Sequence, residues 1–170
     1  MKNLTKVLLV VFSLLLAASF AYAIHEEKPS ETQAVMPGPD AAKLYEYIAK
    51  SKPYDQWKLW PGKGRLYKGG EPHGALLTTF VNNEAYFSIG KKAKMDENAI
   101  IVKENYTGDK KLVALTVMYK IKGYSPSAGD WFWAKYDPFG KVLASGRVDA
   151  CINCHGAKKD NDYIMTAKLK

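Results

Sequence analysis

Two cysteines and a histidine stand together near the C-terminus, in the segment Cys-Ile-Asn-Cys-His at 151–155. If this segment forms a helical turn, Cys151, Cys154 and His155 lie at i, i+3 and i+4 and therefore on one face. Cys-x-x-Cys-His is the pattern by which proteins attach a c-type haem. The two thiols would become thioethers, and the His155 imidazole would bind the iron as its proximal ligand. Asp149 is placed to cap the turn at its N-terminus.

Other uses of the two thiols need a different setting. A thioredoxin-type dithiol would lie near the start of a βαβ unit, and the sequence ahead of the motif shows none. A Cys2His2 zinc site would need His25 or His73 from far along the chain, because only two cysteines and three histidines are present. An exported protein also favours haem, since thioether bonds protect the thiols from oxidation.

The first 23 residues have the three parts of a secretory signal peptide. Lys2 and Lys6 precede an apolar run at 7–20, and Ala-Tyr-Ala at 21–23 is a typical cleavage site. A retained membrane anchor is the alternative, but the apolar run is short for a bilayer and no stop-transfer segment follows it. We therefore expect cleavage after Ala23, export to the periplasm and no membrane span in the mature protein.

Cleavage would leave a chain of ordinary single-domain size, able to bury a core without disulfides. We expect a flexible leader at 24–39, rich in charge and proline, and a single haem-binding domain at 40–170. Loss of the two signal-peptide lysines takes the formal charge from +8 to +6. The lysines are scattered over many segments, which argues against nucleic acid and favours solubility or docking to an acidic redox partner protein.

Periodicity predicts the elements that must hold the motif. Asp40 precedes an amphipathic helix at 41–50, and 84–94 is a second helix candidate. Between and after them lie β-rich segments separated by turn signals, at 75–81, 99–106, 112–121, 131–136 and 141–145. The sequence therefore predicts an α+β fold, mainly an antiparallel β-sheet with an N-terminal helix and a short C-terminal haem-binding helix.

The position of the motif distinguishes between classes of cytochrome. Small all-helical cytochromes carry the motif early and a methionine ligand far downstream, whereas here the motif lies close to the C-terminal end of the sequence. Four-helix cytochromes c′ carry it late, but the predicted hairpins cannot form a helix bundle.

Several short segments, taken together in their order along the chain, resemble the cytochrome P-460 family, which includes the β-type cytochromes c′ (cytochrome c′-beta). The resemblance covers about residues 40–166 and rests on Leu-Trp-Pro-Gly at 59–62, Pro-His-Gly at 72–74, and the segments 99–106, 129–136, 151–155 and 159–163. It implies a mainly antiparallel β domain that forms a homodimer. It also implies one covalent haem c whose iron is five-coordinate and open on its distal side.

The resemblance implies one of two arrangements on the distal side of the haem. The hydroxylamine-oxidising members add a lysine cross-link to the porphyrin, and the lysines in the corresponding region are Lys94 and Lys103. These enzymes can also use a distal carboxylate, for which the segment 142–150 offers only Asp149, so we expect no cross-link and favour the cytochrome c′-beta type. There, aromatic side chains cap the iron and small gases bind; the candidates are Phe80, Phe87, Phe132 and Tyr136. Arg65 and Arg147 are candidates to neutralise haem propionates.

These expectations give one favoured function and two alternatives. The favoured one is an exported protein whose five-coordinate iron binds nitric oxide or a related small nitrogen species. The alternatives are a hydroxylamine-oxidising enzyme of the P-460 type and a six-coordinate electron-transfer cytochrome. No side chain stands out as a sixth ligand; the possible ones are His73, Met95, Met118 and Met165. His73 lies in a turn that explains itself without a metal.

Overall fold

The computed structural model describes residues 35–169, and its frame is a seven-stranded antiparallel sheet. The strand order is β1-β3-β4-β5-β6-β7, with β2 paired to β3 beside this path. The strands are β1 (Lys58–Leu59), β2 (Tyr67–Gly70), β3 (Gly74–Val81), β4 (Ile100–Tyr106), β5 (Leu112–Lys120), β6 (Trp131–Tyr136) and β7 (Val142–Gly146). The expected signal peptide and most of the expected leader lie outside the described residues.

Within residues 35–169, three α-helices accompany the sheet: α2 (Ala41–Glu46), α3 (Asn83–Gly90) and α4 (Asp149–Gly156). α2 continues as a π-type turn at Tyr47–Ser51, and short 3₁₀ turns lie at Tyr54–Gln56, Pro126–Ala128 and Lys159–Asn161. This architecture confirms the predicted α+β class with a mainly antiparallel sheet. Among residues 35–169, no helix has the length and apolar character needed to cross a membrane.

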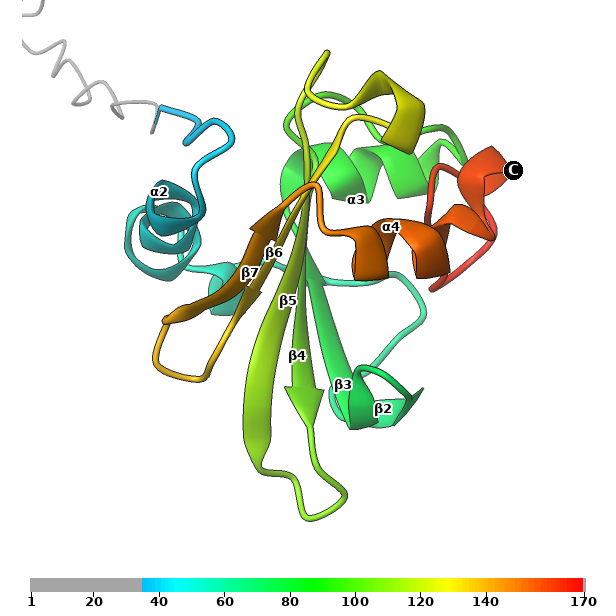
Figure 1. Ribbon diagram of the computed structural model, residues 1–170. Coiled ribbons are helices and arrows are strands. Elements are labelled where there is room, and N and C mark those ends of the chain that lie inside the picture. Colours follow the sequence, from blue (N-terminus) through cyan, green and yellow to red (C-terminus); the bar gives the residue numbers. More distant parts are fainter. Residues whose placement is uncertain (1–34, 170) are drawn as a thin grey trace, which may run out of the picture. The chain divides into compact units, whose positions relative to one another are not determined.

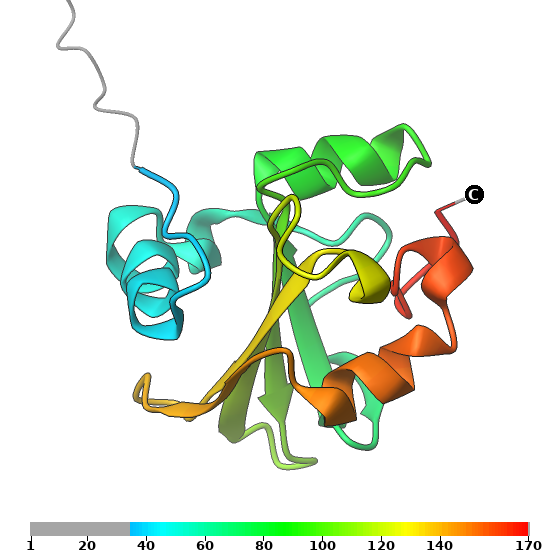
Figure 2. The ribbon, with the colours of Figure 1, turned by 45° about the horizontal axis from the view of Figure 1, so that its top comes forward.

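Helix α2 and helix α4 lie on opposite sides of the sheet (Figures 1 and 2). As expected, Asp40 caps α2, because its Oδ1 accepts hydrogen bonds from the backbone N–H groups of Ala42 and Lys43 at 2.9 and 3.0 Å. Leu44 and Ile48 are fully buried against one face of the sheet. Burial of each such side chain stabilises the fold by about 1.5–3 kcal/mol, which fixes the helix to this face.

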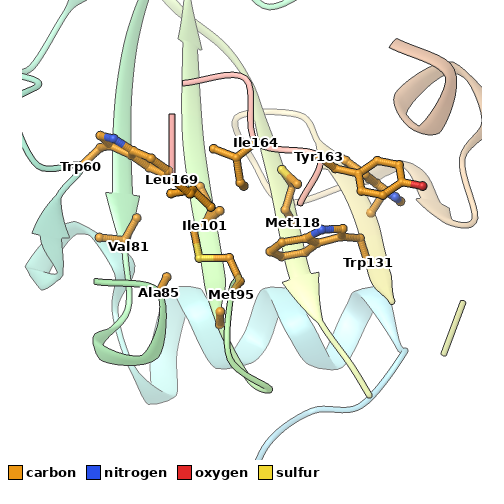
Figure 3. Close-up of a cluster of buried hydrophobic side chains, with 12 residues drawn as sticks. Trp60, Val81, Ala85, Met95, Ile101, Met118, Trp131, Tyr163, Ile164 and Leu169 are labelled. Atoms are coloured by element: carbon orange, nitrogen blue, oxygen red, sulfur yellow. The ribbon is translucent and has the colours of Figure 1, made fainter. Parts of the chain in front are cut away.

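The opposite face of the sheet carries a second buried cluster (Figure 3). Ile101 on β4, Met118 on β5 and Trp133 on β6 are direct cross-strand neighbours in this cluster. Two residues along each strand, a second row on the same face runs through Lys103, Thr116 and Lys135. The C-terminal segment after α4 packs onto this face through buried residues that include Tyr163, Ile164 and Leu169.

The second helix is shorter than the pattern predicted. α3 begins after Asn82, whose Oδ1 accepts a hydrogen bond from the Ala85 N–H at 3.1 Å, and it ends at Gly90. Lys92 has φ of 51°, a left-handed conformation that stops the helix before Lys94. Strands β1 and β2 were not predicted, because they are very short and β2 ends in two glycines, which carry no strand signal.

Candidate haem-binding site

The Cys-x-x-Cys-His motif lies on helix α4, as the i, i+3, i+4 spacing predicted. Cys151, Cys154 and His155 all line one cavity between α4 and the sheet. The predicted cap needs a correction: Val148 is the N-cap residue, and Asp149 is the first residue of the helix and makes no capping hydrogen bond. Its carboxylate still lies in the first turn, where the helix dipole favours a negative charge.

The wall of this cavity is mostly apolar. The cavity has a volume of about 260 Å³ and opens to solvent at its mouth. The apolar side chains that line it include Trp60, Ile101, Met118, Trp133, Val148 and Ile164. The basic side chains that line it are His73, Lys103, Lys135 and His155, and within the described part of the chain no Asp or Glu does so.

His155 is held in one tautomer. Its Nδ1 lies 2.7 Å from the backbone carbonyl oxygen of Tyr163. Because a carbonyl oxygen only accepts, Nδ1 carries the hydrogen and donates it, and Nε2 keeps its lone pair. Burial lowers the pKa of His155, against the opposing effect of the Tyr163 carbonyl. The ring is therefore neutral at neutral pH, in the form in which imidazole binds a metal.

The carbonyl that orients His155 belongs to the loop after α4, within the segment 159–163 that the resemblance included. Asp162 and Tyr163 both have left-handed backbone conformations, with φ of 54° and 65°. The Asp162 carboxylate accepts from Lys120 Nζ at 2.6 Å and from the Met95 N–H at 2.8 Å. Its backbone carbonyl accepts from the Trp131 indole N–H at 3.0 Å. Three separate segments of the fold thus hold this loop in place under α4.

His73, in the turn before β3, lies in the same cavity. Its ring centre is 6.2 Å from that of His155, and the two ring planes cross at 88°. His73 Nδ1 lies 3.0 Å from Asn105 Oδ1. The Asn105 amide nitrogen donates to the carbonyls of Lys103 and Ala114, so Oδ1 is the acceptor, and His73 also keeps its lone pair on Nε2. Burial, helped by the Lys103 charge, lowers the pKa of His73 to about 4.

The two lysines that were candidates for a bond to the porphyrin lie in different surroundings. Lys103 on β4 lines the cavity, whereas Lys94 is exposed beyond α3 and does not. Burial lowers the pKa of Lys103 to about 8, against the opposing effect of Cys154. A minor fraction of the amine is therefore neutral near pH 7 and able to act as a nucleophile.

Trp133 provides a test of whether the cavity fits a haem. Its indole ring is 3% exposed and lies 4.8 Å from the His155 ring, centre to centre. Among residues 35–169, no acceptor lies within hydrogen-bond distance of its buried Nε1–H. A buried donor without a partner is costly and indicates a missing acceptor. Two thiols, an imidazole with its Nε2 lone pair and this donor, in one cavity, fit a haem with its carboxylate side chains.

Comparison with protein families agrees with this geometry. The family model for cytochrome P460 matches residues 51–166. The chain belongs to the cytochrome P460 family. The matched range contains the whole sheet, α3 and α4, so the resemblance noted in the sequence is confirmed and the cofactor of this cytochrome is a haem. No curated protein matches the chain.

In this cytochrome, the four aromatic side chains expected over the iron lie elsewhere. Phe132 and Tyr136 belong to the cluster on the α2 side of the sheet, and Phe80 pairs with Val102 on that side. Phe87 is 57% exposed on α3. The expectation that these side chains cap the iron is therefore corrected. For the three strand residues the reason is that successive residues of a strand alternate between the two faces of the sheet. The face with the cavity carries Trp133 instead, which the strand pattern alone could not distinguish from Phe132.

The remaining candidates fall into two groups. Arg65 and Arg147 do not line the cavity and instead contact the rings of Phe80 and Tyr124, with the Arg147 guanidinium also donating to the Tyr124 carbonyl at 2.6 Å. Of the possible sixth ligands, Met95 is buried in the core outside the cavity, whereas His73, Met118 and Met165 line it. Within residues 35–169, no group of three or more His, Cys, Asp or Glu side chains is arranged to hold a metal ion.

Proposed function

We propose that this cytochrome is an exported monohaem protein that binds nitric oxide or a related small nitrogen species at the haem iron. Cys151 and Cys154 would hold one haem c through thioether bonds, and His155 Nε2 would bind the iron. The haem supplies a redox-active iron with an affinity for diatomic ligands. The form that takes the ligand would be five-coordinate, with His155 as the single protein ligand.

The observation that carries this proposal is the composition of the cavity wall. Large apolar side chains, two of them tryptophans, line a site that no described Asp or Glu lines. A neutral diatomic molecule loses little hydration on entering such a site, whereas a cationic ligand loses much and meets no carboxylate among the described residues. Among residues 35–169, the wall also offers no carboxylate to take a proton from a bound substrate. It therefore favours reversible binding over acid–base chemistry.

His155 would contribute more than one bond to the iron. The hydrogen bond from Nδ1 to the Tyr163 carbonyl keeps the lone pair on Nε2 and fixes the plane of the ring. Such a bond also increases the electron donation of the imidazole. In this proposal the loop around Asp162 sets the strength of the proximal ligand.

A second function is favoured by one specific observation. The Lys103 amine lies in the cavity with a pKa lowered to about 8, as a lysine that forms a covalent bond to the porphyrin would need. His73 is neutral and could accept a proton in place of the carboxylate. Hydroxylamine oxidation is therefore the alternative that the experiment must separate from simple binding.

Ligand titration and turnover assays of the holoprotein test the two functions. We expect the reduced protein to bind nitric oxide tightly, with a shift of its main haem absorption band, and to bind carbon monoxide. With hydroxylamine and an electron acceptor, we expect no steady formation of nitrite or nitrous oxide. Steady formation that is lost in Lys103→Met but kept in Lys94→Met would refute the binding role and establish the enzyme.

The proposal extends to the setting of the protein. It places the mature chain in the periplasm after cleavage behind Ala23, with 24–39 as a leader and 40–170 as the haem domain. Homodimer formation and a redox partner protein belong to the same proposal. The excess of basic residues over acidic ones favours an acidic surface on that partner.

A further inference from the structure

The two histidines of the cavity are held in the same way. In each ring, Nδ1 donates to a protein oxygen: the Tyr163 carbonyl for His155 and the Asn105 side chain for His73. Within the described residues, neither Nε2 takes part in a hydrogen bond. Both imidazoles therefore keep a lone pair on the nitrogen that commonly binds a metal.

The separation of the rings is close to that of two imidazoles bound to one metal ion. An imidazole nitrogen lies about 2 Å from a metal that it binds and about 1 Å from its own ring centre, so two imidazoles on opposite sides of one ion have centres about 6 Å apart. The observed distance between the ring centres is 6.2 Å. The crossing angle of 88° is no obstacle, because each ring can take any orientation about its own metal–nitrogen bond.

We propose that His73 is the second axial ligand of the resting haem iron and that a small ligand binds by displacing it. This inference rests on the proposed haem at Cys151, Cys154 and His155, and it adds a resting state to the five-coordinate form that takes the ligand. The two forms would be in equilibrium, and the incoming molecule would bind the one that His73 has left.

The surroundings of the two histidines decide which one leaves. His155 is 7% exposed, lies between α4 and the sheet, and follows a cysteine that would itself be bonded to the haem. His73 lies in a surface turn with exposed neighbours at Glu71 and Pro72. One strong side-chain hydrogen bond, to Asn105, orients its ring. Moving His73 therefore disturbs only the turn, whereas moving His155 would disturb a helix and the core.

Asn105 acts as a positioning residue for His73. It is 2% exposed on β4, and its amide nitrogen is committed to the Lys103 and Ala114 carbonyls and to Thr116 Oγ1. These bonds fix the direction of Oδ1 and with it the tautomer of His73. The same amide also joins β4 to β5 through the Ala114 carbonyl, next to the register shift between Asn105 and Tyr106.

Spectra of the purified holoprotein test the inference. We expect low-spin spectra for the oxidised and reduced wild-type protein, and high-spin five-coordinate spectra for His73→Leu. His73→Met retains a side chain able to bind iron and should remain low-spin in the reduced state. A high-spin wild-type protein, or a low-spin His73→Leu variant, would overturn the proposal. Met165→Leu tests the rival thioether, and conversion of this variant to high spin would assign the ligand to Met165 instead.

Ligand kinetics give an independent readout. If His73 must leave first, the rate of carbon monoxide binding to the wild type reaches a plateau as its concentration rises. In His73→Leu the rate should stay linear, and the apparent affinity should rise by about tenfold or more. A linear rate in the wild type, equal to that of the variant, would overturn displacement.

The failure of this inference can be separated from failure of the proposed function. Intact mass reports covalent haem in every variant and shows that the protein has matured. A high-spin wild-type protein that carries haem and binds nitric oxide would keep the proposed function and reject His73. A haem-containing protein in which neither the wild type nor His73→Leu binds nitric oxide would reject the function itself.

Discussion

Several side chains in the cavity have a polar atom that makes no hydrogen bond within residues 35–169, and this atom is the one available for chemistry. His155 and His73 present Nε2, Trp133 presents an indole N–H, and Lys103 presents an amine with a lowered pKa. In each case, burial or a hydrogen bond elsewhere on the side chain determines that state. The state of these side chains therefore depends on neighbours such as Asn105, which does not line the cavity.

The first prediction at this scale concerns the lysine bond to the porphyrin. We expect none, because no described carboxylate lines the cavity to accompany it. Trypsin should then release the haem on the single peptide 148–158, which lies between Arg147 and Lys159. The mass of this haem peptide should be identical in wild type, Lys103→Met and Lys94→Met. A second peptide spanning 95–110, joined to the haem in the wild type and absent in Lys103→Met, would contradict the prediction.

At the scale of elements, the loop after α4 connects the helix to the sheet. The ion pair between Lys120 on β5 and Asp162 is nearly buried, with 13% and 5% of the two side chains exposed. The same carboxylate receives the Met95 N–H. Because Tyr163 follows directly, this cluster also positions the carbonyl that holds His155. Gly129, at φ of 70°, lies where a Cβ would meet the Tyr163 ring at 2.7 Å, so this approach requires a glycine.

The second prediction is a large loss of stability when this pair is broken. Asp162→Asn leaves the Lys120 ammonium poorly exposed and without its counter-charge, and should lower the free energy of unfolding by about 3 kcal/mol. Urea unfolding of the holoprotein, followed by far-UV circular dichroism, measures the change. Glu46→Gln is the matched control, because the Glu46–Lys50 pair is 3.7 Å apart and well exposed, and its loss should cost about 0.5 kcal/mol or less. Equal losses for the two variants would contradict the role of the cluster.

At the scale of the whole molecule, one sheet separates two layers with different tasks. On one face α2 covers a closed apolar core, and on the other α4 and the C-terminal segment form the cavity (Figure 1). A ligand can therefore bind or leave on the cavity side without disturbing the core on the α2 side, which stabilises the sheet. The candidate haem site and helix α2, which follows the expected leader, therefore lie on opposite faces of the sheet.

The third prediction combines export and attachment in one measurement. Protein recovered from the periplasm should have the mass of residues 24–170 plus one haem. Cys151→Ala should keep its haem through the single thioether of Cys154, with an altered absorption band in alkaline pyridine. The double variant Cys151→Ala, Cys154→Ala should lose covalent haem altogether. Retention of residues 1–23, or two thioether bonds remaining in Cys151→Ala, would contradict the expectation.

Local patterns in the sequence were sufficient for most of the elements and for the motif. The spacing of Cys151, Cys154 and His155 places them on one side of a helical turn wherever that turn lies in the fold. The Asp40 cap and the alternation along 112–121 likewise depend only on near neighbours. For this reason the α2 cap, most of the strands and the family followed from the sequence, whereas the exact start of α4 at Asp149 did not.

The tertiary structure decided which distant residues meet the motif. Alternation divides a strand into two faces but does not say which face meets α4, so Phe132 and Trp133 were equivalent in the sequence. Only the docking of α2 on one side and α4 on the other placed Trp133 in the cavity and Phe132 in the opposite core. His73 looked like part of a turn because its partners, Asn105 and His155, are far away in the chain. The pairing of β3 with β4 and the seating of α4 bring them together, and neither contact leaves a local signal in the sequence.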